Sequence, residues 1–456
     1  MKKQKNFIFK CSGCGHEEPK WLGRCPGCGE WNTLEETPFS ANKRSADSKG
    51  LALSVPLSSV DPLEGSRISS GIQELDRVLG GGILKHSSIL VGGEPGIGKS
   101  TLLLQIAAAA DTKARILYVS GEESAGQIKM RADRLEIKDR AEKIEILSTG
   151  CLEEILTITQ AVKPVLILVD SAQTLYSLET GVSPGTLNQM KHCAWELISW
   201  VKEHDAALFL TAHVTKDGLI SGPKSLEHMV DTVLYFEQSD KSISPGSLDC
   251  RFLRGTKNRF GSVDEIGFFT MGEKGLSTVE DPSLLFLVRR EGALPPGIVT
   301  AAVTEGTRTL LVEIQALTVP AKGSISRVFS DRIDTARVSR VAATIEKHLG
   351  LRLSDQDLYV NVAGGIRISD VGVELALATA LYSARTGIPG PLKTAIAGEL
   401  SLAGEVRALS RLPGREKTAK DLGFTSFVGP LPELTDESSH ISVNDIKSAV
   451  KAIFGA

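Results

Sequence analysis

The chain has 456 residues, long enough for two to four domains of about 100 to 200 residues, each with its own core. Its 52 basic and 55 acidic side chains give a formal charge of -3, which excludes the chain-wide basic field of histone-like and ribosomal proteins. Any surface that binds nucleic acid must therefore be confined to a region where basic side chains are concentrated. The apolar run at residues 7–9 is too short for a signal peptide, and no stretch approaches the roughly 18 apolar residues of a membrane span. These features predict a soluble, cytoplasmic (cytosolic) protein without a membrane partner.

Four of the seven cysteines lie in the first 28 residues, as the pairs Cys11-x-x-Cys14 and Cys25-x-x-Cys28. Two such pairs can bind one tetrahedral Zn²⁺ through four thiolates. A site closed by four cysteines has no open position for a substrate, so we expect a structural zinc finger whose folding depends on the metal. Redox-active or unliganded cysteines are the alternative, and His16 is surplus to the four ligands. The other cysteines stand alone in apolar sequence and are predicted to be core thiols: Cys151, Cys193 and Cys250.

The finger is predicted to occupy residues 1–37 and to be followed by a linker at 38–59, which has no sustained periodicity. From about residue 67, short β-branched runs alternate with helical stretches, which indicates a mostly parallel α/β sheet. Strands are expected at 88–91, 115–119, 165–169 and 207–211, and helices at 100–110 and 187–203. Near Asp281 the pattern changes to a new mix of strands and helices. This change separates the domain at 60–280 from a third domain at 281–456. There strands are expected at 297–303 and 310–315, and helices at 335–348 and 371–386.

A glycine-rich loop follows the strand predicted at 88–91. Its sequence matches G-x-x-x-x-G-K-[ST] and opens the helix predicted at 100–110, the context that this phosphate-binding motif requires. Backbone N–H groups of such a loop surround the β-phosphate of ATP, Lys99 reaches the β- and γ-oxygens, and the Ser100 hydroxyl coordinates Mg²⁺. A fortuitous glycine-rich turn is the alternative. The residues predicted to bind ATP are Gly93, Glu94, Pro95, Gly96, Ile97, Gly98, Lys99, Ser100 and Thr101.

Carboxylates and a histidine end three other predicted strands. Asp170 follows the apolar run 165–169, where α/β nucleotide sites lie, and is predicted to complete the Mg²⁺ shell; a helix cap is its alternative role. Glu122 and Glu123 end another strand, and one of them is needed to orient the attacking water, with Glu122 favoured. His213 is a candidate sensor of the γ-phosphate, or else a buried histidine with satisfied hydrogen bonds.

These residues, with residues 69–82 and the pentapeptide Lys257-Asn-Arg-Phe-Gly261, resemble the bacterial RadA (Sms) family of recombination and repair ATPases. The four-cysteine finger, the loop GEPGIGKS, the stretch TAHVTKDGLISGPKSLEHMVD and KNRFG occur in that family's order and spacing. The likeness spans nearly the whole chain. It implies a RecA-like ATPase core in a homo-hexameric ring that translocates on single-stranded DNA, extends heteroduplex on branched DNA and works with a RecA-type recombinase.

The same resemblance implies roles for several basic residues. In such rings a Lys or Arg of one subunit completes the ATP site of its neighbour, and Lys257 and Arg259 are the candidates, with DNA contact as a further role. From spacing alone KNRFG would be a basic surface turn. The stretch 214–230 resembles the loop that faces DNA in the pore of such rings, so Lys216 and Lys224 are predicted to contact DNA phosphates.

The segment from about residue 285 onward resembles the α+β domain of Lon protease, most clearly at 357–366 and 398–406. Lon proteases use a Ser-Lys dyad in which the lysine deprotonates the serine. Gly372 or Val373 stands where the serine is expected, and residues 412–414 stand where the lysine is expected. We therefore predict no peptidase activity, and a structural or DNA-binding role for this domain.

Arginines cluster around the helix that is expected to begin near Asp334, and they could extend a DNA track outside the ring. A solvated face paired with Asp331, Asp334 and Glu346 is the favoured alternative. The cluster comprises Arg327, Arg332, Arg337 and Arg340.

Two other functions need to be distinguished from the DNA motor. A KaiC-like ATPase that switches a protein partner would share the core, but the zinc finger and KNRFG argue against it. Single-stranded DNA would not raise the ATP turnover of such a switch. An ATP-dependent protease of the Lon type would need the missing dyad.

Overall fold

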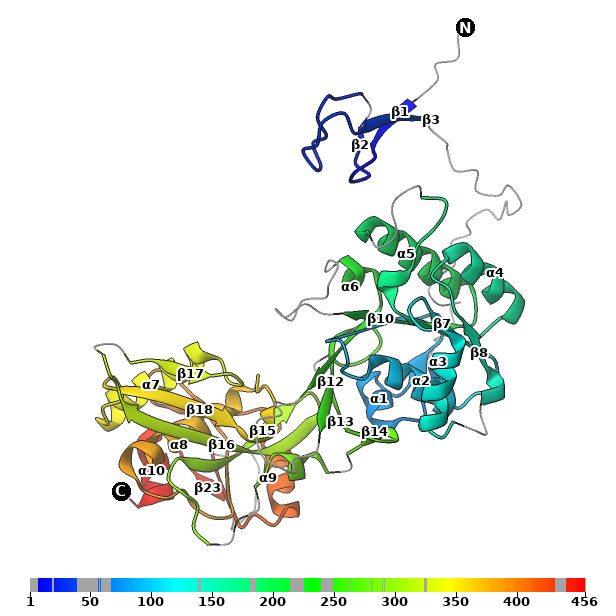
Figure 1. The fold of residues 1–456 in the computed structure, drawn as a ribbon. Coiled ribbons are helices and arrows are strands. Elements are labelled where there is room, and N and C mark those ends of the chain that lie inside the picture. Colours follow the sequence, from blue (N-terminus) through cyan, green and yellow to red (C-terminus); the bar gives the residue numbers. More distant parts are fainter. Residues whose placement is uncertain are drawn as a thin grey trace. The chain divides into compact units, whose positions relative to one another are not determined.

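The computed structural model describes residues 7–18, 20–38, 56, 58, 67–137, 141–180, 186–213, 225–238, 249–263, 265–279, 281–288, 290, 292–323, 326–430 and 440–455 (Figure 1). Their contacts divide the chain into two compact units. The first comprises Met1–Ile72, Leu79–Leu234 and Asn258–Phe260, and the second comprises Gln73–Val78, Tyr235–Lys257 and Gly261–Ala456. The domain boundaries that the sequence predicts at 37/38, 59/60 and 280/281 stay predictions.

A small antiparallel sheet begins the first unit. It comprises β1 (Phe7–Cys11), β2 (Glu17–Glu18) and β3 (Leu34–Pro38), in the order β2-β1-β3. Its core consists of the buried Cys11, Cys25 and Leu34, with Phe9 and Cys14 partly buried against them. So small an apolar core cannot stabilise the folded module by itself. The fold of this module therefore depends on the ion that the cysteines bind.

The glycine-rich loop belongs to a parallel sheet whose neighbouring strands follow the order β6-β10-β9-β7-β8. These strands are β6 (Ser88–Gly93), β7 (Ile116–Ser120), β8 (Ile144–Leu147), β9 (Leu166–Asp170) and β10 (Ala207–His213). Every residue of β6 and β7 is buried, as expected for a parallel sheet covered on both faces. The four predicted strands and the parallel α/β fold are confirmed.

Helices connect these strands, and those predicted at 100–110 and 187–203 are confirmed. The helices of this unit are α2 (Lys99–Ala109), α3 (Ala125–Arg134), α4 (Leu152–Val162), α5 (Leu187–Glu203) and α6 (Ser225–Met229), with 3₁₀ turns at Ala141–Lys143 and Ala172–Thr174. A capping box between Ser124 and Gln127 starts α3. The antiparallel pair β4 (Arg67–Ile68) and β5 (Ile83–Leu84) precedes β6, and β11 (Thr232–Gln238) follows α6.

The second unit contains a seven-stranded mixed sheet in the order β17-β18-β16-β15-β19-β22-β23. Its strands are β15 (Ile298–Glu305), β16 (Arg308–Pro320), β17 (Val328–Ser330), β18 (Gln356–Val362), β19 (Thr394–Ile396), β22 (Ser426–Gly429) and β23 (His440–Ser442). The other strands are β12 (Cys250–Asn258), β13 (Ile266–Gly272), β14 (Gly275–Thr278), β20 (Glu399–Leu400) and β21 (Val406–Arg407). The strands expected at 297–303 and 310–315 are confirmed.

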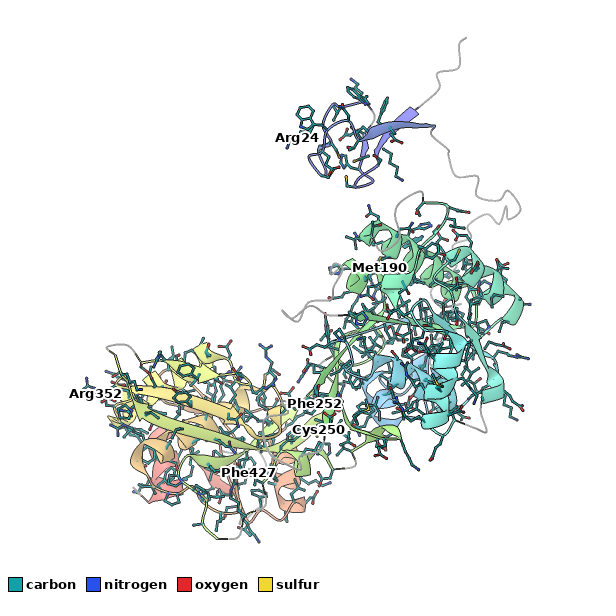
Figure 2. The ribbon with its side chains drawn as sticks, in the orientation of Figure 1. Arg24, Met190, Cys250, Phe252, Arg352 and Phe427 are labelled. Atoms are coloured by element: carbon teal, nitrogen blue, oxygen red, sulfur yellow. The ribbon has the colours of Figure 1, made fainter. Side chains whose placement is uncertain are left out.

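Helices α7 and α8 cover this sheet and confirm the two helices predicted there. The helices are α1 (Gln73–Val78), α7 (Thr335–Leu349), α8 (Glu374–Thr386), α9 (Leu412–Asp421) and α10 (Ile446–Phe454), with 3₁₀ turns at Pro282–Leu285, Ala363–Gly365 and Val371–Val373. One apolar core runs from α7 and α8 to β12, the strand that carries Phe252 (Figure 2). Phe252 meets Phe268 edge to face, with 5.8 Å between the ring centres. None of the described helices is long and apolar enough to span a membrane.

Candidate nucleotide and zinc sites

The four N-terminal cysteines converge on one point. Their Sγ atoms all lie within 4.8 Å of one another, with 3.6 Å between Cys11 and Cys28 and 3.5 Å between Cys14 and Cys25. A tetrahedral Zn²⁺ with Zn–S distances of about 2.3 Å separates its sulfurs by about 3.8 Å, so this donor set fits the metal. His16 is not needed, because its Nε2 pairs with Glu18 at 3.0 Å.

A Cys28→Ala variant is expected to lose about one zinc per chain, because three thiolates cannot close the tetrahedron that holds this small core. Metal analysis of the purified protein measures the loss. Cys193→Ala is the matched control, since Cys193 is fully buried on α5 and burial raises the pKa of its thiol to about 12. Unchanged zinc in Cys28→Ala would contradict the assignment. Cys151 and Cys250 are also buried, which confirms all three as core thiols.

The phosphate-binding loop connects the end of β6 to the start of α2. Gly96 and Gly98 adopt φ values of 77° and 115°, a left-handed region that other residues rarely enter. This conformation lets the chain turn sharply into α2, whose first N–H groups face the loop. The other predicted ATP-binding residues lie in this loop or in the first turn of α2, so the structure brings the whole motif together.

Lys99 is buried at the base of this loop, with only 5% of its surface exposed. Its Nζ donates to the carbonyl oxygens of Gly93 at 2.8 Å and Glu94 at 2.9 Å, and lies 3.3 Å from Nδ1 of His213. Burial lowers the pKa of Lys99 to about 8, while the carboxylates of Asp170, Glu122 and Glu94 act in the opposite direction. An ammonium stripped of water in this way interacts strongly with a phosphate.

Asp170 ends β9, which lies between β7 and β10. Its carboxylate accepts a hydrogen bond on each oxygen. Thr211 Oγ1 donates to Oδ1 at 2.8 Å, and the Tyr118 hydroxyl donates to Oδ2 at 3.2 Å. Both donors come from flanking strands, and sequence reasoning missed them because no motif reports which side chains face each other across a sheet.

The structure separates the two adjacent glutamates. Glu122 accepts from Ser171 Oγ at 2.8 Å, and its Oε1 lies 3.9 Å from His213 Nε2, so it shares the cluster that contains Lys99. Glu123 turns toward α3, where it pairs with Arg131 at 2.5 Å. The sequence favours Glu122 as the carboxylate that orients the attacking water, and this role stays a prediction.

The KNRFG pentapeptide places Arg259 beside Asp231. Arg259 Nη1 lies 3.1 Å from Asp231 Oδ1, and its backbone N–H donates to the Asp231 carbonyl at 3.2 Å. Asp231 is buried and also accepts from the N–H and hydroxyl of Ser88, at 3.0 and 2.7 Å. Ser88 is the first residue of β6, whereas the phosphate loop follows the last. Arg259 therefore lies at the opposite end of this strand from its own loop. Lys257 lies on β12.

Comparison with known proteins agrees with both sites. Residues 9–36 match a rubredoxin metal binding domain and residues 56–219 match an AAA domain. The DNA repair protein RadA of Treponema pallidum is 55% identical over 94% of this chain and 93% of its own length. The chain belongs to the RadA family of DNA repair proteins. It therefore carries an ATPase domain that uses ATP with Mg²⁺ and a four-cysteine ribbon that binds Zn²⁺.

Other RadA proteins are also similar along almost the whole chain. That of Bacillus subtilis is 42% identical over 93% of both chains. Among solved structures, a KaiC-like protein of Pyrococcus horikoshii matches 47% of this chain and 98% of its own, with 20% identity and a TM-score of 0.39.

The predicted pore loop of this RadA family member lies mostly outside the described residues. Lys216 and Lys224 both fall there, so their DNA contacts stay predictions. The described end of the stretch is not a loop, because Ser225–Met229 form α6. Leu226 and Val230, four residues apart, are fully buried, and this apolar spacing favours a helix.

The positions expected to hold a Ser-Lys dyad lie near each other in this RadA chain, but they carry different chemistry. Gly372 and Val373 form a 3₁₀ turn, and a Cβ atom on Gly372 would lie 2.8 Å from Nη1 of Arg415. Arg415 is fully buried and donates to Asp370 at 2.5 Å and to the Ala302 carbonyl at 2.7 Å. A buried ion pair thus fills this place, and an arginine cannot lose its proton to act as a base.

Acceptors within their own domain bind three of the clustered arginines. Arg327 donates to Asp357 at 2.8 Å, Arg340 donates to Glu374 at 3.3 Å, and Arg337 donates to two backbone carbonyls at 3.0 Å. Arg332 also has a partner. Paired arginines agree with the solvated-face interpretation more than with a free DNA track.

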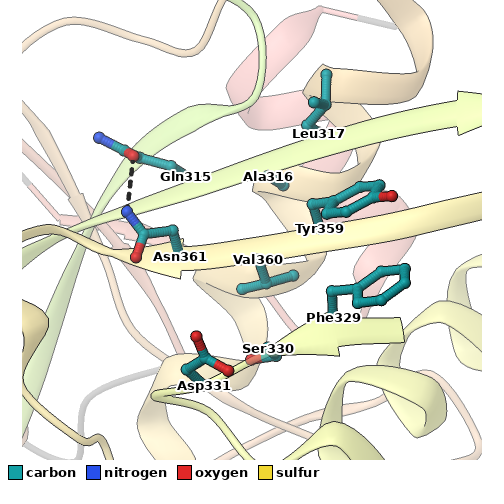
Figure 3. Close-up of a pocket in the computed structure, with 9 residues that line it drawn as sticks. All are labelled: Gln315, Ala316, Leu317, Phe329, Ser330, Asp331, Tyr359, Val360 and Asn361. Atoms are coloured by element: carbon teal, nitrogen blue, oxygen red, sulfur yellow. Dashed lines mark hydrogen bonds between the residues drawn. The ribbon is translucent and has the colours of Figure 1, made fainter. Parts of the chain in front are cut away.

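Two of the acidic residues expected to pair with these arginines bind backbone N–H groups first. Asp334 accepts N–H groups at the start of α7, and Glu346 accepts two backbone N–H groups beyond its end. The backbone N–H groups, followed by the charges of Arg337 and Arg340, lower the pKa of Asp334, so the expected attraction between Asp334 and these two arginines is present. Asp331 lines an open groove of about 400 Å³ beside Phe329 and Tyr359 (Figure 3). These two rings stack at 4.7 Å on the exposed face of β17 and β18.

Proposed function

We propose that this protein is a DNA-dependent ATPase that translocates on single-stranded DNA and promotes branch migration of recombination intermediates. Its relatives are named DNA repair proteins, and its ATPase domain supplies the energy source that such movement needs. The proposal also includes a homo-hexameric ring and a RecA-type recombinase as a partner, both of which follow from the resemblance to the RadA family.

The position of Arg259 is the observation that carries the motor proposal. The six residues of β6 span roughly 17 Å at about 3.3 Å per residue, and Arg259 lies at the end away from the loop. An arginine so placed is poorly positioned for its own γ-phosphate, but 53% of its side chain is exposed and available to a neighbouring subunit. We propose that Arg259, with Lys257 near it in sequence, completes the neighbour's ATP site as an arginine finger does.

Within each site the proposed chemistry divides among four residues. Lys99 would neutralise charge that develops on the β- and γ-phosphates, and Ser100 with Asp170 would hold the Mg²⁺ shell. Bound Mg²⁺ supplies further charge neutralisation. Glu122 would orient the attacking water, since Ser171 holds its carboxylate by a hydrogen bond and its charge acts on Lys99. Glu123 is less suited to that role because Arg131 already pairs with it.

For the C-terminal domain we propose a structural or DNA-binding role without peptidase activity. Neither Gly372 nor the buried Arg415 offers a nucleophile or a base. Casein cleavage that is stimulated by ATP would contradict this proposal.

The experiment that tests the motor proposal is ATP hydrolysis by the zinc-loaded protein, with and without single-stranded DNA, over a salt series. Stimulation that fades as salt rises is expected if DNA phosphates enter a channel lined by basic residues. If DNA at low salt left turnover unchanged, the alternative would be a KaiC-like ATPase that switches a protein partner.

A further inference from the structure

Asp170 is an acidic group near the phosphate-binding loop whose two carboxylate oxygens both accept hydrogen bonds. Each of its carboxylate oxygens accepts a hydrogen bond from a different neighbouring strand, Oδ1 from Thr211 on β10 and Oδ2 from Tyr118 on β7. Tyr118 and Thr211 are both fully buried, so bulk water does not compete for these hydrogen bonds. The carboxylate is therefore held from both sides at the end of β9.

We propose that Tyr118 and Thr211 are positioning residues, which fix the Asp170 carboxylate in the one orientation that serves the Mg²⁺ shell. The inference rests on the proposed role of Asp170 and adds the two residues that orient its carboxylate for that role. A carboxylate offers about four lone-pair positions, so two remain for the metal or its water ligands after both hydroxyls are bound. Partners that orient a ligand in this way commonly change metal affinity 10- to 100-fold when removed.

Tyr118 suits this role because it stays a donor. Its one polar side-chain atom is a buried hydroxyl, which lies on the neighbouring strand β7 and donates to Asp170 Oδ2 at 3.2 Å. Thr211 also stays a donor, because its hydroxyl does not titrate, and its 2.8 Å bond to Asp170 is shorter than its 3.4 Å approach to the Val169 carbonyl.

The test uses the full chain with Tyr118→Phe and Thr211→Val, each of which removes a hydroxyl and keeps the shape of the side chain. Binding of a fluorescent ADP analogue is measured at increasing Mg²⁺, and again with a chelator. In each variant we expect a rise of about tenfold in the Mg²⁺ concentration that gives half of the increase in nucleotide binding. The affinity for the nucleotide without metal should stay unchanged. Thr211→Ser keeps the hydroxyl and should retain most of the wild-type Mg²⁺ requirement.

Asp170→Asn separates this inference from the one it rests on. If Asp170→Asn binds nucleotide with the Mg²⁺ dependence of the wild type, the proposed role of Asp170 fails. If Asp170→Asn loses that dependence while Tyr118→Phe and Thr211→Val keep it, with unchanged melting temperatures, only the positioning role is overturned. A loss of both metal-dependent and metal-free binding in Tyr118→Phe would also contradict the inference, since it would mean general damage to the site.

Discussion

Replacement of Lys99 by alanine is expected to lower ATP turnover by at least about 100-fold, since it removes a buried cation that contacts the loop. The ammonium lies in a water-poor site, where its interaction with phosphate oxygens is stronger than in bulk water. Release of inorganic phosphate at saturating ATP, by zinc-loaded protein, measures the effect.

Lys113→Ala is the matched control for this variant. Lys113 is an exposed lysine in the same domain, close to the end of α2, and its loss should leave turnover near that of the wild type. Turnover of Lys99→Ala within about tenfold of the wild type would mean that the loop does not bind the reacting phosphates.

For Arg259→Ala we expect nucleotide binding to persist and DNA-stimulated ATP turnover to fall by about 1,000-fold. This factor is the lower end of the range for the loss of an arginine finger. The side chain is half exposed, so its removal should leave the domain folded. Fluorescent ADP binding and DNA-stimulated phosphate release are measured together. Arg115→Ala is the control, because Arg115 is equally exposed and pairs with Glu145 on the sheet.

Mixing the Lys99→Ala and Arg259→Ala variants tests directly whether Arg259 acts in the ATP site of a neighbouring subunit. Lys99→Ala and Arg259→Ala subunits should each be inactive alone, for different reasons. If the arginine of one subunit serves the site of the next, mixed rings contain some sites with both residues intact, and turnover returns in part. No recovery in mixtures that are shown to exchange subunits would place Arg259 outside the neighbour's site.

Local sequence motifs predicted the parts of this molecule that depend on local chemistry. The paired cysteines and the glycine-rich loop carry their own geometry, because turns and backbone N–H groups within a few residues create each site. Periodicity also predicted the main strands and helices. The short helix α6 was missed because Leu226, within it, and Val230, just after it, stand in a stretch whose glycines and lysines suggested a loop.

Contacts between distant segments could not be predicted in the same way. Tyr118 meets Asp170 across neighbouring strands, Arg131 draws Glu123 away, and Arg415 fills the space beside Gly372. Each of these contacts depends on the register of paired strands or on where a helix packs, and a single sequence does not determine either. The same limit explains why the hydrogen bonds that Asp334 and Glu346 accept from backbone N–H groups were not predicted.

Strand β6 has a different partner at each end, the phosphate loop after Gly93 and Asp231 beside Ser88. In the proposed ring one end would serve the subunit's own nucleotide, and the other, through Arg259, would serve the next. Close packing would let a fully buried strand transmit a displacement from one end to the other. In the proposed ring, hydrolysis in one subunit would then be coupled to the next subunit through β6. A substitution that loosens the packing of β6 would leave each site able to bind ATP and yet weaken the coupling between neighbouring subunits.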